Sequence, residues 1–450
     1  MIATPTRWNS RISFIFAASA AAIGLGNIWR FPYLVGQNGG GAFVLMYLGF
    51  VLVLGVPLLI AEMIIGRIGR HNPAKAMASV SEQSNHSRLW GMAGGITIIA
   101  AFLILSYYVV IIGWVLDYFV RALTGQFAHA TEATSAANFA ALRANHWRML
   151  FSDSLVVLGT MSIIIFGIKR GLERAVMIMF PALLILMLIL LGYALTTSGF
   201  HEALIFLFKP DLSEVTSHTI LIALGQAFFS LNIAMAITMM FSAYLPKKTP
   251  IISSAIAIAI ADTGFAILSG LIIFPIVFTY HLKANAGPSL IFQTLPIAFG
   301  QLPYGTLIAS LFFLLLFFAA FTSSIALIEP AVSWMMERFH IKRISAVLIT
   351  GIGCWLLSLG SIFSFTEWKN VTLLGKTFYQ FVDMITAGIM LPLGGMLIAL
   401  FTGWFIKKQI LENELAWKTH HGWYRVWQFV LRYFAPIAIL LILLMPFNLI

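Results

Sequence analysis

A lone carboxylate stands inside an apolar segment of this chain. Asp262 follows the apolar residues 252–260 and precedes the apolar residues 265–277, which argues against a span end that faces water. A charged side chain at membrane depth is costly to bury and marks a functional site by default. Because hard cations such as calcium prefer oxygen ligands, Asp262 is a candidate cation ligand.

Two further segments carry polar or helix-breaking residues inside apolar runs. They are Gly-Leu-Gly-Asn at 24–27 and Phe-Ser-Leu-Asn at 229–232. Opened backbone is tolerated at membrane depth only where it lines a cavity or is buried in protein. Paired interruptions in corresponding spans are typical of secondary transporters. Unwinding at the first would free carbonyls near Ala20, Ala22 and Ile23 as additional oxygen ligands.

The elements that position these residues must lie in lipid. The chain has 450 residues, of which 60% are hydrophobic and 10% charged, whereas soluble domains average about 45–50% apolar and about 25% charged residues. A spanning helix needs about 20 apolar residues, so the length leaves room for about eleven or twelve. The basic residues behind the net charge of +11 lie between the apolar runs, which indicates cytoplasmic loops and no nucleic-acid partner.

The apolar runs predict an all-α membrane protein of about eleven spans, in a single transporter domain over residues 1–450. We expect two inverted repeats of five spans, at about 11–197 and 218–406, with an appended span at about 426–447. The spans are expected near 11–35, 41–66, 90–120, 153–168, 175–197, 218–244, 251–280, 304–335, 343–363, 376–406 and 426–447, with a pair of short amphipathic helices in 285–302. The distribution of Lys and Arg predicts a cytoplasmic N-terminus, and an odd number of spans then puts the C-terminus outside.

Several motifs occur in the order and spacing of a known family. They are Trp-Asn-Ser-Arg at 8–11, GLGNIWRFPY at 24–33, Asn-Gly-Gly-Gly-Ala-Phe at 38–43, Pro57-Leu58 with Glu62, Gly66-Arg67, Tyr107-Tyr108, Gly-Gln-Ala-Phe-Phe-Ser-Leu at 225–231 and Phe-Thr-Ser-Ser at 321–324. Over nearly its whole length the chain resembles the neurotransmitter:sodium symporter family, in the eleven-helix type of the bacterial leucine and hydrophobic-amino-acid transporters. That type is itself the standard example of broken helices at the bilayer midplane. The resemblance implies a bacterial inner-membrane protein with broken first and sixth spans. It also implies sodium-coupled symport of a neutral, hydrophobic or aromatic, amino acid by alternating access.

The resemblance also implies two sodium sites. The first would use the Ala22 carbonyl, Asn27, Ser230 and Asp262, and the second the Ala20 and Ile23 carbonyls, Ala319, Thr322 and Ser323. For Thr322 and Ser323 alone, back-bonding within a packed helix is the common alternative. Animal members carry asparagine at the position of Asp262 and bind chloride nearby. Because Asp262 supplies the negative charge and Ala266 replaces their serine, the resemblance implies transport without chloride.

A substrate site follows from the same resemblance. The amino-acid carboxylate would meet the free N–H groups at Leu25 and Gly26 and the hydroxyl of Tyr108. Its ammonium group would meet carbonyls around Phe229 and Ser230. The residues implied to bind substrate are Ala22, Leu25, Gly26, Ile104, Tyr108, Phe229, Ser230, Asn232, Met235, Ser323 and Leu327. Asn232 and Met235 depart from the residues usual in the family, which leaves the exact substrate open.

Gates on either side of this site are implied as well. Arg30 and Asp383 match the extracellular gate pair, with Gln226 nearby and Phe229 as an aromatic lid. On the inner side Glu337 takes the place of the gate acid, Arg7 is its nearest basic partner, and Trp8 and Tyr244 complete the seal. Glu62 is expected to bond the opened backbone of the sixth span.

Other functions are weighed against symport. No His-Glu-x-x-His pair or Ser/His constellation occurs in the spans, which disfavours an intramembrane enzyme. A channel would need a repeated filter or rings of one charge. Proton-coupled transport and a substrate sensor that does not transport are the alternatives that stay open. Glu329 is a second buried acid whose role, structural or as a proton site, the sequence leaves open.

Overall fold

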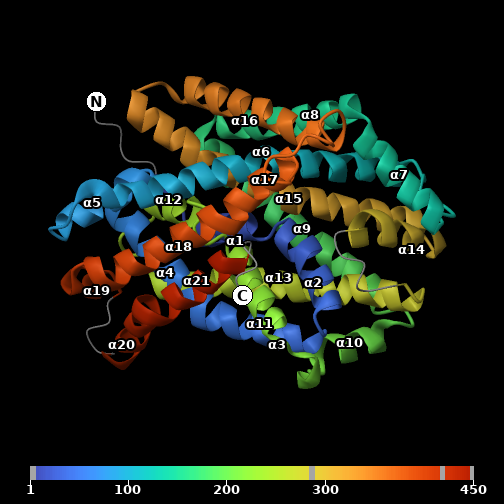
Figure 1. Ribbon diagram of the computed structural model, residues 1–450, viewed down its shortest axis with the longest axis horizontal. Helices are drawn as coiled ribbons and strands as arrows, with labels where there is room; N and C mark the ends of the chain where they lie inside the picture. Colours follow the sequence, from blue (N-terminus) through green and yellow to red (C-terminus); the bar gives the residue numbers. More distant parts are fainter. Residues whose placement is uncertain (1–6, 283–288, 416–420, 446–450) are drawn as a thin grey trace.

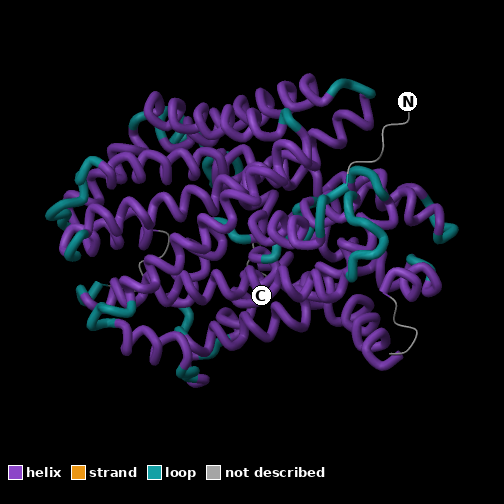
Figure 2. The backbone as a smooth tube through the Cα atoms, turned by 180° about the vertical axis from the view of Figure 1, so that it is seen from behind, coloured by secondary structure: helices purple, strands orange, loops and turns teal. Residues whose placement is uncertain are grey.

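The computed structural model describes residues 7–282, 289–415 and 421–445. Within these ranges the chain is helical apart from loops and two isolated β-bridges. Long helices run side by side along the longest axis of the molecule (Figure 1), and Figure 2 shows from behind the short connections between them. In the described residues nine helices are long and apolar enough to cross a membrane, or ten if one bent pair counts as a span. Two short helices, α11 (Ser217–Ser230) and α12 (Ile237–Ala243), form the remaining expected span.

The first half of the chain forms spans one to five and their connections. Its elements are α1 (Arg11–Ala22), η1 (Gly26–Arg30), α2 (Phe31–Gln37), α3 (Gly41–Phe50), η2 (Val51–Gly55), α4 (Val56–Gly69), α5 (Pro73–Gln83), η3 (Arg88–Trp90), α6 (Gly91–Leu123), α7 (Glu132–Ala144), α8 (His146–Ile164), η4 (Ile168–Glu173), α9 (Arg174–Ala194) and α10 (Phe200–Phe208).

The second half forms the remaining spans. Its elements are η5 (Leu212–Glu214), α11 (Ser217–Ser230), α12 (Ile237–Ala243), α13 (Ile251–Thr279), η6 (Leu290–Thr294), α14 (Leu295–Gln301), α15 (Gly305–Phe339), α16 (Arg343–Phe365), α17 (Phe378–Asp383), η7 (Met384–Met390), α18 (Leu391–Leu400), η8 (Phe401–Phe405), α19 (Lys408–Leu415), α20 (His421–Phe429), η9 (Val430–Phe434) and α21 (Ala435–Leu444).

Three of the predicted boundaries differ from the structure. The fifth span begins at Ile168, not at 175, because the wide π-helical turn η4 precedes α9. The fourth span begins at His146, not at 153, because the Asn145 side chain accepts a hydrogen bond from the Arg148 N–H and caps the helix there. In place of two short helices in 285–302, η6 runs directly into α14, so the described part is one helical segment. Pro296 directly follows the wide π-helical turn of η6, and prolines and π-type turns are places where helices bend. Residues 285–288 of the predicted range lie outside the described residues.

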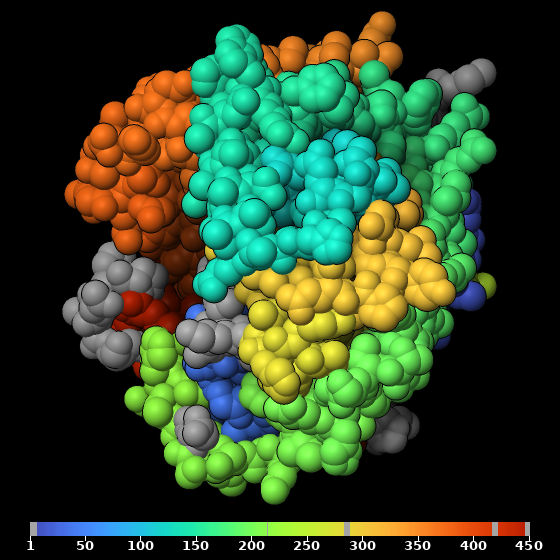
Figure 3. Space-filling view, turned by 90° about the vertical axis from the view of Figure 1, so that its right-hand side faces the viewer, coloured from blue at the N-terminus to red at the C-terminus, as the bar shows by residue number. Residues whose placement is uncertain are grey.

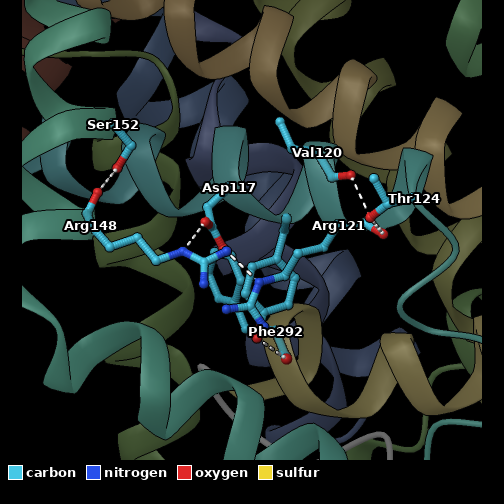
Figure 4. Close-up of polar contacts among 8 residues, drawn as sticks. Asp117, Val120, Arg121, Thr124, Arg148, Ser152 and Phe292 are labelled. Atoms are coloured by element: carbon cyan, nitrogen blue, oxygen red, sulfur yellow. Dashed lines mark hydrogen bonds and ion pairs between the residues drawn. The ribbon is translucent and has the colours of Figure 1, made fainter.

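Short helices gather at the two ends of the molecule. In Figure 1, α7, α10 and α14 lie at one end and α5, α19 and α20 at the other. Figure 3 looks onto the first of these ends and shows a hollow between the teal α7 and the orange residues of the C-terminal half. Here Asp117 of α6 lies between two arginines (Figure 4), with its oxygens 2.8 Å from Arg121 Nε and 2.5 Å from Arg148 Nε. The Arg148 pair joins α8 to α6 at this end, whereas the Arg121 pair lies within α6.

Candidate functional site

The first interruption produces a bend between two half-helices. α1 stops at Ala22, and the segment from Gly26 to Gln37 continues at an angle of 52°. The Leu25 N–H at the start of the second half donates to the Tyr108 hydroxyl at 3.3 Å. A Cβ on Gly24 would lie 2.7 Å from the Ser323 hydroxyl oxygen, so glycine is needed for this close approach. The predicted break of the first span is confirmed.

The second interruption is longer and is held by a carboxylate. Between α11 and α12, residues 231–236 leave the helix, and Asn232, Ala234 and Ala236 have φ of 52°, 63° and 63°. This left-handed region is unfavourable for residues that carry a Cβ. Glu62, fully buried on α4, accepts a hydrogen bond from the Ala234 N–H at 2.7 Å. The predicted contact of Glu62 with the opened backbone is thus present.

Three polar side chains from different helices meet beside these breaks. The Ser230 hydroxyl donates to Asp262 Oδ2 at 2.6 Å, and Asn27 Nδ2 donates to Asp262 Oδ1 at 2.8 Å. Tyr47 of α3 adds its hydroxyl 3.1 Å from that of Ser230. All four residues are buried, with at most 1% of their surface exposed. A carboxylate, two hydroxyls and an amide form a donor set suited to a hard cation, provided that Asn27 turns its amide oxygen toward the centre.

A second set of oxygens joins α15 to the end of α1. The Thr322 hydroxyl lies 2.9 Å from the Ala20 carbonyl, and the Ser323 hydroxyl lies 2.9 Å from the Ala21 carbonyl. Both hydroxyls also lie close to the Ala319 carbonyl, at 3.0 and 3.2 Å. Thr322 and Ser323 therefore bond back to a carbonyl of their own helix and also bond carbonyls of α1. Four of the predicted oxygens thus lie together. Ile23 is fully buried, and among the described residues no hydrogen bond joins its carbonyl to the Thr322 or Ser323 hydroxyl.

A cavity of about 250 Å³ lies above the break of the first span. Of the predicted substrate residues, Leu25, Gly26, Tyr108 and Phe229 line it. Ala22, Ile104, Met235, Ser323 and Leu327 are buried and lie outside its lining, and Ser230 is engaged by Asp262. The Asn232 amide donates to the Ala21 carbonyl at 2.7 Å. The predicted substrate residues therefore fall into two groups: four line the cavity, and the others are buried behind its lining or bonded to other residues.

The predicted outer gate residues lie at the rim of this cavity. Arg30 and Asp383 both line it and also line a neighbouring cavity of about 640 Å³. The Arg30 guanidinium lies 4.5 Å over the ring of Phe229, a cation–π contact. Among the described residues Arg30 and Asp383 form no ion pair, so the predicted gate contact is not made. Gln226 Nε2 donates instead to the Gly26 carbonyl at 3.0 Å, which ties α11 to the first break.

At the opposite end the seal differs in part from the prediction. Trp8 is buried, and its indole N–H donates to the Phe241 carbonyl at 2.8 Å, while its backbone N–H donates to the Tyr244 carbonyl at 3.4 Å. Glu337 pairs with His71 Nδ1 at 3.1 Å and Lys75 Nζ at 3.8 Å. Arg7 as the nearest basic partner of Glu337 is therefore wrong. The reason is that His71, in the loop before α5, and Lys75, in the first turn of α5, lie beside the end of α15.

Comparison with known proteins agrees with this geometry. The model of the family described as "Sodium:neurotransmitter symporter family" matches residues 6–141 and 138–449. The chain belongs to that family. An uncharacterised sodium-dependent transporter of Bacillus subtilis (strain 168), YhdH, is 36% identical over 442 residues, which cover 98% of this chain and 97% of the relative. Another uncharacterised sodium-dependent transporter, from Haemophilus influenzae, is 34% identical and covers 97% of this chain and 96% of its own length.

A solved structure extends the likeness to the whole fold. The crystal structure of MhsT in complex with L-phenylalanine has a TM-score of 0.89 and 38% sequence identity, covering 98% of this chain and 99% of that chain. Members of the sodium:neurotransmitter symporter family are transporters. This chain is therefore a multi-pass membrane transporter that depends on sodium, and it is not an enzyme.

Some residues of this symporter's site lay beyond sequence reasoning. Tyr47 reaches Ser230 and Asp262, but in the sequence it is one aromatic residue within an apolar run. Tyr379 and Ile111 line the cavity without any motif. Glu329, whose role was open, is fully buried and forms a two-pronged ion pair with Arg343, at 3.0 and 2.5 Å. That pair supports a structural role for Glu329.

Proposed function

We propose that this symporter imports a neutral, hydrophobic or aromatic, amino acid together with sodium, by alternating access and without chloride. The observation that carries the proposal is the meeting of Asn27, Ser230 and Asp262 at the edges of two helix breaks. A buried carboxylate among hydroxyl and amide groups favours a hard cation as its partner. Coupling follows because substrate and ion would contact the same broken segments.

Two sodium ions are proposed as co-substrates. The first would be held by the Ala22 carbonyl, Asn27, Ser230 and Asp262. The second would be held by oxygens of Ala20, Ile23, Ala319, Thr322 and Ser323. The close approach of hydroxyls on α15 to α1 carbonyls supports the second site. Chloride independence rests on Asp262, because a fixed carboxylate already balances one sodium charge, and on Ala266, which has no hydroxyl to offer an anion.

The substrate is proposed to lie on the floor of the 250 Å³ cavity. Its carboxylate would accept hydrogen bonds from the N–H groups near Leu25 and Gly26 and from Tyr108. Its ammonium group would meet carbonyls at the α11–α12 break. Ile104, Met235 and Leu327 are apolar and offer no charge to pair with an acidic or basic side chain, and an unpaired buried charge is costly. The L-phenylalanine in the MhsT structure supports a large apolar substrate.

Access would alternate between the two ends of the molecule. We propose two inverted five-span repeats, at 11–197 and 218–406, a cytoplasmic N-terminus and an outer C-terminus. Closing of Arg30 toward Asp383, with Gln226 and Phe229, would seal the outer side. Separation of Trp8 from Phe241 and Tyr244, beside Glu337, would open the inner side.

Uptake into proteoliposomes tests the proposal. Radiolabelled leucine or phenylalanine should accumulate with a sodium gradient, equally in chloride and gluconate, and not in potassium or choline. Competition by tryptophan, methionine and tyrosine should exceed that by glutamate or lysine. A proton gradient that replaces sodium would indicate the proton-coupled alternative. Substrate binding without uptake would indicate a sensor, and a strict chloride requirement would refute the role given to Asp262.

A further inference from the structure

An apolar groove of about 370 Å³ lies between α6, α15 and α16, apart from the central cavity. Phe102 and Trp334 are among the side chains that line it, and Ile99 and Ile349 in its lining are 53% and 51% exposed. Its one hydroxyl, on Thr350, already donates to the Ala346 carbonyl at 2.7 Å. The lining is thus almost entirely apolar, and in a membrane protein its exposed side faces lipid.

A cation stands below the groove on each of its three walls. Seven residues along a helix make about two turns and about 10 Å, and return to nearly the same face. Arg338 of α15 lies seven residues after Ala331 and so on nearly the same face of that helix. Arg88, in the 3-10 turn η3 before α6, and Lys342, the extended N-cap residue of α16, lie seven positions in sequence from the lining residues Gly95 and Ile349, toward the connections before α6 and between α15 and α16.

These cations are largely free to meet a ligand. Arg338 and Lys342 are exposed, and neither forms an ion pair with any described residue. Arg88 pairs with Glu82 at 2.9 Å, but both side chains are exposed, at 72% and 46%, and such surface pairs contribute little. The surface thus combines an acyl-sized apolar recess with a positive rim about two helical turns away.

We propose that this surface binds an anionic phospholipid of the surrounding membrane. One acyl chain would occupy the groove, and the headgroup phosphate would lie against Arg88, Arg338 and Lys342. Basic clusters at the cytoplasmic ends of spans attract anionic headgroups by about 1 kcal/mol for each cation. In the proposed orientation these ends face the cytoplasm, so the lipid belongs to the inner leaflet. A zwitterionic lipid would fill the groove but gain little from the rim.

The groove also lies directly behind the second helix break. Ile98 and Ala331, which line it, pack against Ala236, the left-handed residue that precedes α12. The acyl chain would therefore lie one layer of side chains from the half-helix that alternating access must move. Occupancy of the groove is expected to favour one position of α12.

Native mass spectrometry of the full-length purified protein tests the lipid site. It would be titrated with phosphatidylglycerol and with phosphatidylcholine of identical chains. We expect the first to bind about tenfold more tightly or better. Arg338→Gln with Lys342→Gln should lower its affinity by about tenfold or more. The matched control, Lys247→Gln with Lys248→Gln, removes the same charge beside α13 and should leave the affinity unchanged.

A second variant tests the groove itself. A Cβ on Gly95 meets nothing within 4 Å, so Gly95→Leu should fill the groove without a backbone clash and weaken both lipids. Gly49→Leu, at another open and exposed glycine, is its control. Equal binding of the two lipids to the wild type would overturn the proposal, as would equal losses in both charge variants. If Gly95→Leu is thermally unstable, the two charge variants alone decide.

Discussion

Replacing Asp262 with asparagine removes the one fixed charge of the first proposed sodium site. The carboxylate is fully buried and accepts hydrogen bonds from Ser230 at 2.6 Å and from Asn27 at 2.8 Å. The new amide keeps one oxygen for Ser230, and Asn27 can turn its own amide to accept from the new NH₂ group. The volume is almost unchanged, so we expect the fold and the second proposed sodium site to persist.

The loss of charge sets the size of the effect. Two unit charges 4 Å apart attract each other by about 4 kcal/mol at an effective dielectric of 20. The hydration that sodium recovers outside the protein offsets part of this value. A remaining loss of about 1.4 kcal/mol lowers sodium affinity tenfold. We therefore expect Asp262→Asn to need at least about tenfold more sodium for half-maximal substrate binding.

Sodium-dependent binding of radiolabelled substrate in detergent measures this shift. Asp153→Asn is a matched control, because Asp153 is also fully buried in a span but bonds Ser358 of α16, outside the proposed sites. The control should keep the wild-type sodium response. Adding Ala266→Ser to Asp262→Asn should restore part of the binding only with chloride. A normal sodium response in well-folded Asp262→Asn would show that Asp262 is not a ligand.

Substitutions at three further sites test contacts at the two breaks and the pairing of Glu329 with Arg343. Glu62→Ala leaves the Ala234 N–H without its acceptor, so thermal unfolding should show a loss of about 1–3 kcal/mol in the free energy of unfolding. Glu62→Gln keeps an oxygen acceptor and should lose less. Equal losses in the two variants would argue against this hydrogen bond. Glu329→Gln leaves the Arg343 charge without its partner and should lower the free energy of unfolding by about 3–5 kcal/mol. Glu329→Gln with Arg343→Met should recover most of this loss. A double variant as unstable as the single one would contradict a structural pair. Gly24→Ala forces apart the hydroxyls facing the first break and should lower substrate affinity at least about tenfold in the same binding assay; wild-type affinity would show that this close approach is dispensable.

The breaks were predictable because their cause is local. Gly24 and the polar residues at 229–232 contradict a continuous apolar helix, whatever surrounds them. The meeting of Asn27 with Asp262 was inferred through the family resemblance, because the two residues are 235 positions apart and no periodicity links them. The pairing of Glu337 with His71 and Lys75 was missed for the same reason. Contacts between helices depend on how those helices cross. The residue types within one span do not specify that crossing.

Boundaries were missed where a cap or a widened turn extends a helix. Asn145 caps α8, which begins about two turns before the predicted start at 153, so polar residues occupy its first turns. The distance between Arg30 and Asp383 was beyond prediction as well, because a gate pair forms in one conformation and separates in another. Sequence motifs identify the two residues of such a pair but do not predict whether they are in contact in a given conformation.

The left-handed residues of the α11–α12 break have a consequence for affinity. Alanine loses more than glycine would by adopting this conformation, at about 1–2 kcal/mol for each residue, so Ala234 and Ala236 keep it only because neighbours such as Glu62 enforce it. The carbonyls of the break are consequently preorganised before any ligand arrives. An ammonium group that binds there meets acceptors whose conformational entropy was already lost on folding, which leaves more of the interaction energy to appear as binding.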